Sequence, residues 1–333
     1  MFKITRVLLT STILSVGLAG APAMAQSTGD DSPLDHVEGV PPAEGNEATA
    51  AGEPVETEEA NAPGQEPAFP EQTRAPQPAE MPEVVVDEVA VALPHLWAME
   101  FMPDGRMLVT AKEGALHIVT PEGVAGPEIE GVPEVAAAGQ GGLLDVALAP
   151  DFESSGRIFF SFSEPRDDGN GTSVASATLV TDEENGGALE DVTVIFQQMP
   201  SYDGDKHFGS RLVVSGDNEL YVTVGERSDA PVREQAQDTE SGLGKVFRIN
   251  FDGEPIEDNP FVDGGGLPEI WSYGHRNLQS AELDGEGRLW TVEHGPAGGD
   301  ELNMPEAGLN YGWPVITYGV EYSGAEVGDG QTA

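Results

Sequence analysis

The 333-residue chain contains no cysteine, and only 15 of its residues are lysine or arginine. The absence of cysteine excludes disulfides, thiolate metal sites, cysteine nucleophiles and a lipid anchor attached to cysteine. The few bases, set against 59 acidic residues, give a formal net charge of −44. Nucleic acids and anionic membranes are bound through basic surfaces, so we expect neither as a partner. Most carboxylates are expected to be solvated surface groups, and some could attract divalent cations.

Long apolar runs are also missing, apart from one near the N-terminus. Two basic residues precede an apolar run over residues 7–20, and an Ala-Met-Ala motif typical of signal-peptide cleavage follows at 23–25. The apolar run is too short to span a membrane. We therefore predict a signal peptide over residues 1–25, a mature chain that begins near Gln26, no transmembrane segment, and a periplasmic or secreted location.

Large apolar residues are scarce in residues 26–83, which are rich in Pro, Glu, Ala and Gly. This stretch contains 14 acidic residues and a single base, Arg74. Such a segment cannot bury enough apolar area to offset the entropy of ordering it. We predict a disordered acidic linker here, followed by a folded domain over residues 84–333.

Short β-rich segments separated by Gly, Pro, Asp and Asn make up the chain from Val84 onward. One pattern occurs four times: an apolar strand, a polar turn typical of hairpins, and a second apolar strand. The first apolar residues after the four turns are Met107, Ile158, Leu220 and Leu289. Their spacing of 51, 62 and 69 residues indicates β-propeller blades, whereas a β-sandwich would not repeat one hairpin at that interval.

These repeats predict an all-β fold, a β-propeller of which this chain carries about four blades. No closing strand follows the fourth repeat, so we expect further blades beyond Ala333 and open strand edges in this piece of the propeller.

Polar residues gather in loops that a propeller would bring to one end of its central channel. The four clusters contain Gln140 among glycines, His207 before a strand, His275-Arg276-Asn277 after a strand, and the loop 293–301, which 310–314 continue. Each has an ordinary explanation when taken alone, such as a capped turn, a surface histidine or a solvated carboxylate. Together they supply a histidine for proton abstraction, a guanidinium for an oxyanion, and carbonyl and carboxylate oxygens for Ca²⁺.

The motifs at these positions are highly specific as a set. They read GQGGLLDVAL, HFGSRL, EIWSYGHRN, EHGPAGGDE and NYGWP. From about Leu93 onward the chain resembles the soluble quinoprotein sugar dehydrogenases, and most closely the aldose sugar dehydrogenases that use pyrroloquinoline quinone (PQQ). This resemblance implies a six-bladed propeller, PQQ and Ca²⁺ as cofactors, and oxidation of the C1 hydroxyl of aldose sugars to lactones.

The resemblance also implies a role for individual residues. His207 corresponds to the general base that takes the proton of the anomeric hydroxyl, and Arg276 stabilises the oxyanion that develops on PQQ. The implied contacts to PQQ come from Gln140, Arg276, Asn277 and Tyr322. The implied ligands of a Ca²⁺ that polarises PQQ are the carbonyls of Gly295 and Pro296, with Asp300 beside them. Glu301 and the Tyr311 carbonyl correspond to a second, structural Ca²⁺ site.

Two departures from the family pattern leave the preferred sugar open. Leu278-Gln279-Ser280 stands where the family usually has Pro-Gln-Gly, and Lys206 precedes the base where glucose dehydrogenases carry an aspartate. Two other functions also stay open: a non-catalytic Ca²⁺-binding propeller that recognises protein or carbohydrate, and a Ca²⁺-dependent lactonase. The electron acceptor is unidentified, and a homodimer is possible.

Overall fold

The computed structural model of the chain describes residues 93–182, 185–216 and 218–330, together with short stretches between 51 and 90. The predicted signal peptide lies outside the described residues, and the predicted linker is described only in part, so both stay predictions. Within the described stretches, no helix is long and apolar enough to cross a membrane.

The described chain folds into four antiparallel sheets, each made of strands that are consecutive in sequence. Blade 1 contains β1 (Leu96–Phe101), β2 (Met107–Ala111), β3 (Ala115–Val119) and β4 (Ala125–Glu128). Blade 2 contains β5 (Leu143–Leu148), β6 (Arg157–Arg166), β7 (Gly169–Thr181) and β8 (Gly187–Gln197). Blade 3 contains β9 (Gly209–Ser215), β10 (Glu219–Val224), β11 (Lys245–Ile249) and β12 (Ile270–Tyr273). Blade 4 contains β13 (Leu278–Leu283), β14 (Leu289–Glu293) and β15 (Glu301–Asn303).

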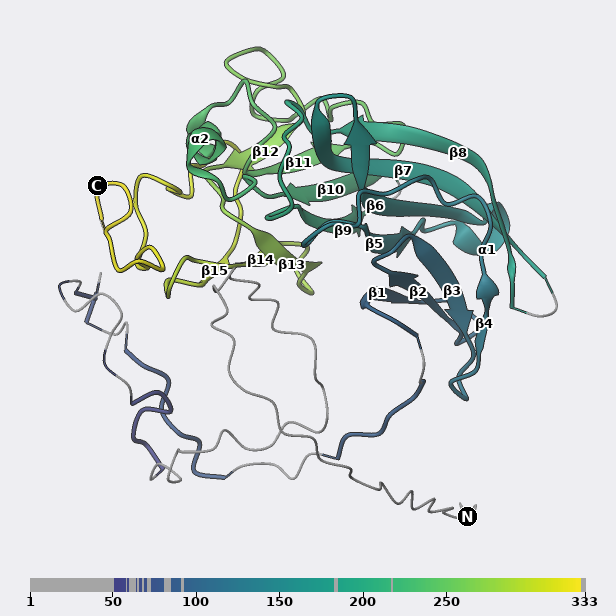
Figure 1. Ribbon diagram of the computed structural model, residues 1–333, viewed down its shortest axis with the longest axis horizontal. Helices are drawn as coiled ribbons and strands as arrows, with labels where there is room; N and C mark the ends of the chain where they lie inside the picture. Colours follow the sequence, from purple (N-terminus) through teal and green to yellow (C-terminus); the bar gives the residue numbers. More distant parts are fainter. Residues whose placement is uncertain are drawn as a thin grey trace, which may run out of the picture.

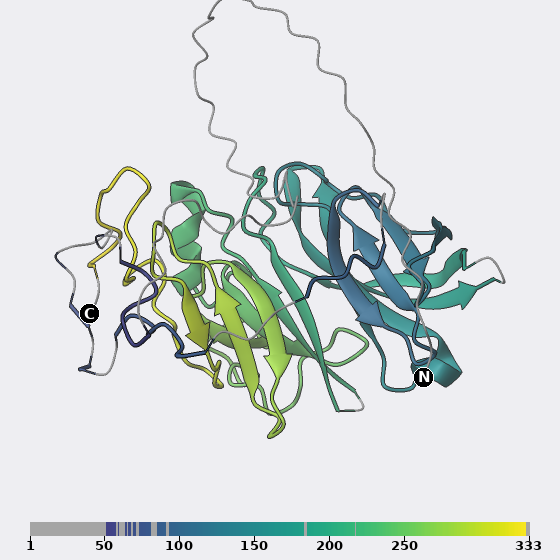
Figure 2. The same cartoon turned by 90° about the horizontal axis from the view of Figure 1, so that it is seen from below.

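This arrangement confirms the predicted propeller, with four blades set side by side in an arc (Figures 1 and 2). The four predicted hairpins are the first two strands of the four blades. The helical elements of the described chain are single turns: α1 (Phe152–Ser155), α2 (Ala230–Arg233) and the 3-10 helix η1 (Glu234–Gln237).

Hairpin turns close through their own polar side chains. In the turn between β13 and β14, Asp284 Oδ1 accepts hydrogen bonds from the backbone N–H groups of Glu286 and Arg288 at 2.9 and 3.0 Å. Gly287 adopts φ 77° there, a conformation that glycine enters without steric cost. The turn chemistry read from the sequence therefore accounts for this hairpin.

Apolar clusters fill the spaces between successive blades. Leu108 of blade 1 packs in one cluster with Phe160 of blade 2, and the rings of Phe196 and Phe247 join blades 2 and 3 with centroids 4.7 Å apart. A third cluster joins blades 3 and 4. An inner blade is thus covered on both faces, which explains why β10 is apolar along most of its length.

One end of the propeller, called the rim below, collects the connections that carry the site. The first strands β1, β5, β9 and β13 lie side by side along the inside of the arc (Figure 1). Because the strands are antiparallel, the start of β13 lies beside the end of β14, and Leu278 pairs with Glu293. Connections that precede a first strand and loops that follow a second strand therefore meet at the rim.

Candidate functional site at the rim

The structure places the predicted residues of three blades at corresponding positions on the rim. Gln140 lies just before β5, His207 just before β9, and Arg276 and Asn277 just before β13. The loop with Gly295 and Pro296 instead follows β14, so it occupies a different position in its blade from the other three connections. It still reaches the same rim, because His294 N–H donates to the Asn277 carbonyl at 3.1 Å.

His207 is held by two hydrogen bonds from different blades. Its Nδ1 lies 2.8 Å from Glu226 Oε2, and its backbone N–H donates to Gln140 Oε1 at 2.8 Å. His207 is 6% exposed and Glu226 is fully buried. A carboxylate accepts a hydrogen bond from a ring nitrogen that carries hydrogen. Glu226 therefore selects the tautomer with hydrogen on Nδ1 and leaves the Nε2 lone pair available. Nε2 itself makes no hydrogen bond to the described part of the chain.

Close backbone approach around His207 requires glycine at position 225. A Cβ at Gly225 would lie 2.2 Å from the His207 carbonyl oxygen and 3.2 Å from Asn277 Oδ1. His207 also has φ 51°, a conformation that non-glycine residues seldom adopt and that is often found at functional sites. The histidine is therefore fixed in its backbone as well as in its ring.

Arg276 lies beside this histidine in a buried position. Its backbone carbonyl accepts from Glu226 N–H at 2.9 Å, and its Nη1 donates to the carbonyls of His294 and Gly295 at 2.9 and 2.7 Å. The guanidinium carbon lies 5.1 Å from the centre of the Trp313 ring. Arg276 Nε is buried and has no partner among the described residues. An unsatisfied buried donor of this kind fits an anionic or carbonyl-rich ligand such as PQQ.

Asn277 is 3% exposed, and its side-chain oxygen is already used within the protein. Oδ1 accepts from Gly209 N–H at 3.2 Å and from Gln279 Nε2 at 3.1 Å. These bonds join the start of β9 to the start of β13. Asn277 therefore aligns the His207 and Arg276 connections, whether or not its amide also reaches a ligand.

A second histidine–carboxylate pair lies one blade further along. His275 Nδ1 lies 2.8 Å from Glu293 Oε2, while Glu293 Oε1 accepts from Arg276 N–H at 2.7 Å. His275 Nε2 lies 2.9 Å from Ser272 Oγ, and the ring stacks on Tyr311 at 4.7 Å. Both ring nitrogens of His275 are thus occupied, which makes it a support for Arg276. Of these two paired histidines, His207 is the one whose second ring nitrogen has no partner among the described residues.

The predicted Ca²⁺ loop closes tightly on itself. Asp300 Oδ1 accepts from Gly295 N–H at 2.8 Å, and a Cβ at Gly295 would lie 2.3 Å from the Gly298 oxygen. Carbonyl and carboxylate oxygens of this kind suit Ca²⁺. Arg276 Nη1 already donates to the Gly295 carbonyl, but a carbonyl oxygen has two lone pairs and can accept a second partner.

The residues of the second predicted Ca²⁺ site also gather here. Glu301 is the cross-strand partner of Glu293, and Tyr311 stacks on His275. Burial, followed by the nearby charge of Glu293, raises the pKa of Glu301 to about 7. Grouped carboxylates that are costly to ionise favour a bound cation. Even so, the described residues contain no cluster of three or more His, Asp or Glu side chains poised to hold a metal.

Tyr322 is the predicted PQQ contact that the structure leaves exposed to solvent, although Val320, two residues earlier, pairs with Ala297 of the predicted Ca²⁺ loop. Its side chain is 80% exposed. Its contact to PQQ stays a prediction.

Glu226 and Arg227 belong to the site although no sequence motif contains them, and Glu293 belongs to it although its motif, EHGPAGGDE, assigned it no role. Glu226 and Glu293 follow or end the apolar second strand of their blades, as in LYVTVGE and LWTVE. An acidic residue at or just after the end of the second strand in two repeats is the signal that could have identified the two carboxylates.

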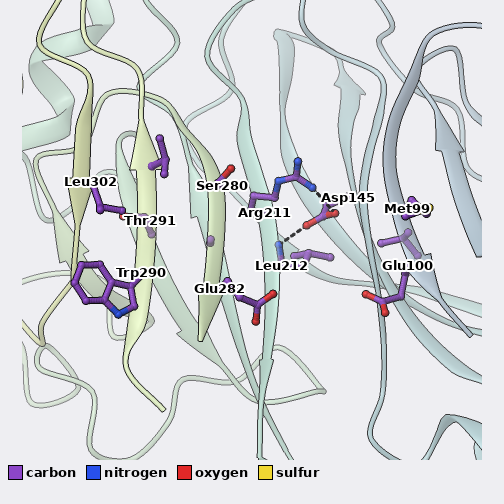
Figure 3. Close-up of a pocket in the computed structure, with 13 residues that line it drawn as sticks. Met99, Glu100, Asp145, Arg211, Leu212, Ser280, Glu282, Trp290, Thr291 and Leu302 are labelled. Atoms are coloured by element: carbon purple, nitrogen blue, oxygen red, sulfur yellow. Dashed lines mark hydrogen bonds and ion pairs between the residues drawn. The ribbon is translucent and has the colours of Figure 1, made fainter. Parts of the chain in front are cut away.

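A cavity of about 380 Å³ lies along the first strands rather than at the rim. Asp145 accepts from Arg211 Nη1 at 3.0 Å and from Leu212 N–H at 2.8 Å, while Glu100 and Glu282 face each other across the space (Figure 3). None of the predicted site residues lines this cavity. It therefore belongs to the channel wall and is separate from the histidine and arginine at the rim.

Comparisons with known proteins place the chain in a family of sugar dehydrogenases. The sequence profile of the glucose/sorbosone dehydrogenase family matches residues 93–333, and the chain belongs to this family. It is 44% identical over 249 residues to aldose sugar dehydrogenase YliI of Escherichia coli K12, covering 73% of this chain and 65% of that protein. The chain thus spans slightly less than two thirds of the length of this relative.

Two solved structures are similar over most of the described chain. The apo form of the soluble aldose sugar dehydrogenase of Escherichia coli has a TM-score of 0.70 at 42% identity, covering 74% of this chain and 71% of that one. The PQQ-bound aldose sugar dehydrogenase of Streptomyces coelicolor has a TM-score of 0.61 at 34% identity, covering 69% of this chain and 66% of that one.

Proposed function

We propose that the protein is an exported quinoprotein that oxidises the C1 hydroxyl of aldose sugars to lactones, with PQQ and Ca²⁺ as cofactors. The observation that carries this proposal is the His207–Glu226 pair, whose free Nε2 shares the rim with the buried Arg276 guanidinium. Membership of the glucose/sorbosone dehydrogenase family supports the same reaction class.

The residues of the rim have separate roles in the proposed reaction. PQQ, when bound, supplies the two-electron acceptor for the hydride that leaves C1 of the sugar. His207 Nε2 takes the proton of the C1 hydroxyl, and Glu226 stabilises the imidazolium that results. Arg276 offers its unpartnered Nε to an oxygen that gains negative charge during the reaction. Gln140 is exposed beside His207, where its amide can contact the sugar or PQQ.

Ca²⁺ would be held by the Gly295 and Pro296 carbonyls with Asp300 nearby, and a second ion by Glu301 and the Tyr311 carbonyl. A cation at the first position would supply positive charge to the cofactor oxygens. A cation at the second would offset the raised pKa of Glu301, because a nearby positive charge favours the ionised carboxylate.

The test is reconstitution of the complete protein with PQQ and Ca²⁺, followed by dye-linked oxidation of glucose and other aldoses. We expect dye reduction in step with lactone formation and a spectral change of PQQ on binding. A protein that binds Ca²⁺ but not PQQ, and that reduces no dye when aldose is added, would instead be the non-catalytic propeller. Lactone hydrolysis without any dye reduction would identify the lactonase alternative.

A further inference from the structure

Arg227 is a fully buried arginine next to the residue that orients the base. It is 0% exposed, and burial lowers its pKa to about 10, so it is still a cation at neutral pH. A buried guanidinium needs partners for its five N–H donors. Those partners show which part of the protein the side chain holds in place.

The donors of Arg227 go to the loop that carries His207. Nε donates to the Lys206 carbonyl at 2.9 Å, and Nη2 donates to the Gly204 carbonyl at 2.6 Å. The guanidinium carbon also lies 3.9 Å from the centre of the Phe208 ring. Arg227 therefore contacts the residues immediately before and after His207, without touching the imidazole itself.

The other end of the same guanidinium is anchored in blade 2. Nη2 donates to Asn170 Oδ1 at 2.7 Å and Nη1 to the Asn170 carbonyl at 3.3 Å. Asn170 belongs to β7 and exchanges backbone hydrogen bonds with Tyr202 at 3.0 Å in both directions. The loop 202–208 is thereby held between blade 2 and the connection that follows β10.

Backbone conformation points to the same region. Arg227 and Ser228 adopt φ 73° and 69°, and His207 adopts φ 51°. Non-glycine residues persist in this region of φ only where the surrounding contacts enforce it, and such residues cluster at functional sites. Two consecutive residues thus act on the same histidine, because Glu226 orients its ring while Arg227 fixes the backbone on both sides of it.

We propose that Arg227 is a positioning residue, which holds loop 202–208 so that His207 Nε2 stays directed at the C1 hydroxyl of the sugar. This inference rests on the proposed function for its kinetic consequence, although the clamp itself is a structural statement. Arg227 takes no direct part in the transfer of the proton or of the hydride. Its loss should therefore slow the reaction through misplacement of the base and leave binding of PQQ nearly unchanged.

The test compares Arg227→Met with Arg248→Met in the complete protein loaded with PQQ and Ca²⁺. Arg248 is a matched control in the same blade, because it is largely buried and lies 5.0 Å from the Trp271 ring, yet it pairs with Glu219 and Asp258 away from the rim. Peptide-level hydrogen exchange over residues 202–208 and kcat for aldose oxidation are measured for both variants. Arg227→Lys is the conservative variant, because lysine keeps the charge and some of the donors.

For Arg227→Met we expect hydrogen exchange in 202–208 to accelerate about tenfold or more. We expect kcat to fall about 100-fold, since small displacements of a reacting group have effects of this size, with PQQ affinity within about threefold of the wild type. Arg248→Met should change neither loop exchange nor kcat in this way, and Arg227→Lys should recover part of both. If Arg227→Met does not fold, Arg227→Lys is measured in its place.

Unchanged hydrogen exchange in loop 202–208 of Arg227→Met would show that Arg227 does not hold this loop. Faster exchange with an unchanged kcat would overturn the positioning role. If the wild type oxidises no aldose, the proposed function fails, and the exchange comparison alone decides whether Arg227 holds the loop.

Discussion

His207 Nδ1 lies 2.8 Å from Glu226 Oε2, so the ring is held by a buried carboxylate that follows the second strand of the same blade. The next blade repeats the relationship between His275 and Glu293 at 2.8 Å. The difference lies at the other ring nitrogen, which Ser272 occupies in His275 and which is available in His207. Of the two histidine–carboxylate pairs, the His207–Glu226 pair is thus the one with a ring nitrogen available to accept a proton.

Glu226→Gln should lower kcat by about 100-fold or more without loss of PQQ binding. The amide can donate its NH₂ to Nδ1, which stabilises the tautomer that carries hydrogen on Nε2 and cannot accept a proton there. Glu219→Gln is the control, because Glu219 lies in β10 and pairs with Arg248. Steady-state kinetics and a PQQ titration check this prediction, and equal kcat values for the two variants would contradict it.

Gly225→Ala should both destabilise the protein and reduce turnover. The added methyl would lie 2.2 Å from the His207 carbonyl, so the loop must move away from β10. Gly285→Ala is the control, since nothing lies within 4 Å of its would-be Cβ. We expect a loss of about 1–3 kcal/mol for Gly225→Ala and at most about 0.5 kcal/mol for Gly285→Ala, measured by denaturant unfolding. Similar losses for both variants would argue against close packing at Gly225.

Lys245 makes the free energy of unfolding depend on pH, and this effect does not depend on the proposed sugar oxidation. It is fully buried, donates to the carbonyls of Gln235, Ala236 and Leu243 at 3.0, 3.0 and 2.6 Å, and burial lowers its pKa to about 7. Between about pH 7 and the ordinary lysine pKa near 10.4, the unfolded chain binds more protons than the folded one, so this group makes stability rise with pH.

The measurement is the free energy of unfolding of the wild type minus that of Lys245→Met, at pH 7 and pH 9.5. This difference should increase with pH by on the order of 1–3 kcal/mol, with the three carbonyl acceptors keeping it below the value that burial alone would give. A difference that stays flat or falls with pH would show that Lys245 remains charged throughout.

Asp300→Asn tests the Ca²⁺ loop. The amide oxygen can still accept from Gly295 N–H, so the loop should keep its shape, while the loss of one negative charge weakens binding of a hard cation. We expect Ca²⁺ affinity to fall about tenfold or more in calorimetry, with an unchanged melting temperature in chelator. Asp263→Asn, at an exposed position in another loop, should leave the affinity as it is. Equal affinities for the two variants would remove Asp300 from the Ca²⁺ site.

Local sequence chemistry predicted much of this fold, because the turn residues and apolar strands that specify each hairpin are close together in the sequence. Turns such as Asp284–Arg288 close through neighbouring residues. The motifs assigned Gln140, His207 and Arg276 to loops at one end of the channel, and the structure has them before the first strands of three blades. The pairing of His207 with Glu226 was less visible, since it depends on the register of β9 against β10. Burial of Arg227 and the bond from Arg276 to the Gly295 carbonyl depend on packing between connections, which no local pattern encodes.

The most direct test of the account is a single-turnover experiment on the complete, PQQ-loaded protein and its His207→Ala variant. Aldose is mixed with excess protein, and reduction of PQQ is followed by its absorbance. We expect the two proteins to bind PQQ equally and the reduction rate of His207→Ala to be lower by about 100-fold or more. Reduction of PQQ by His207→Ala at the wild-type rate would contradict the assignment of His207 as the base.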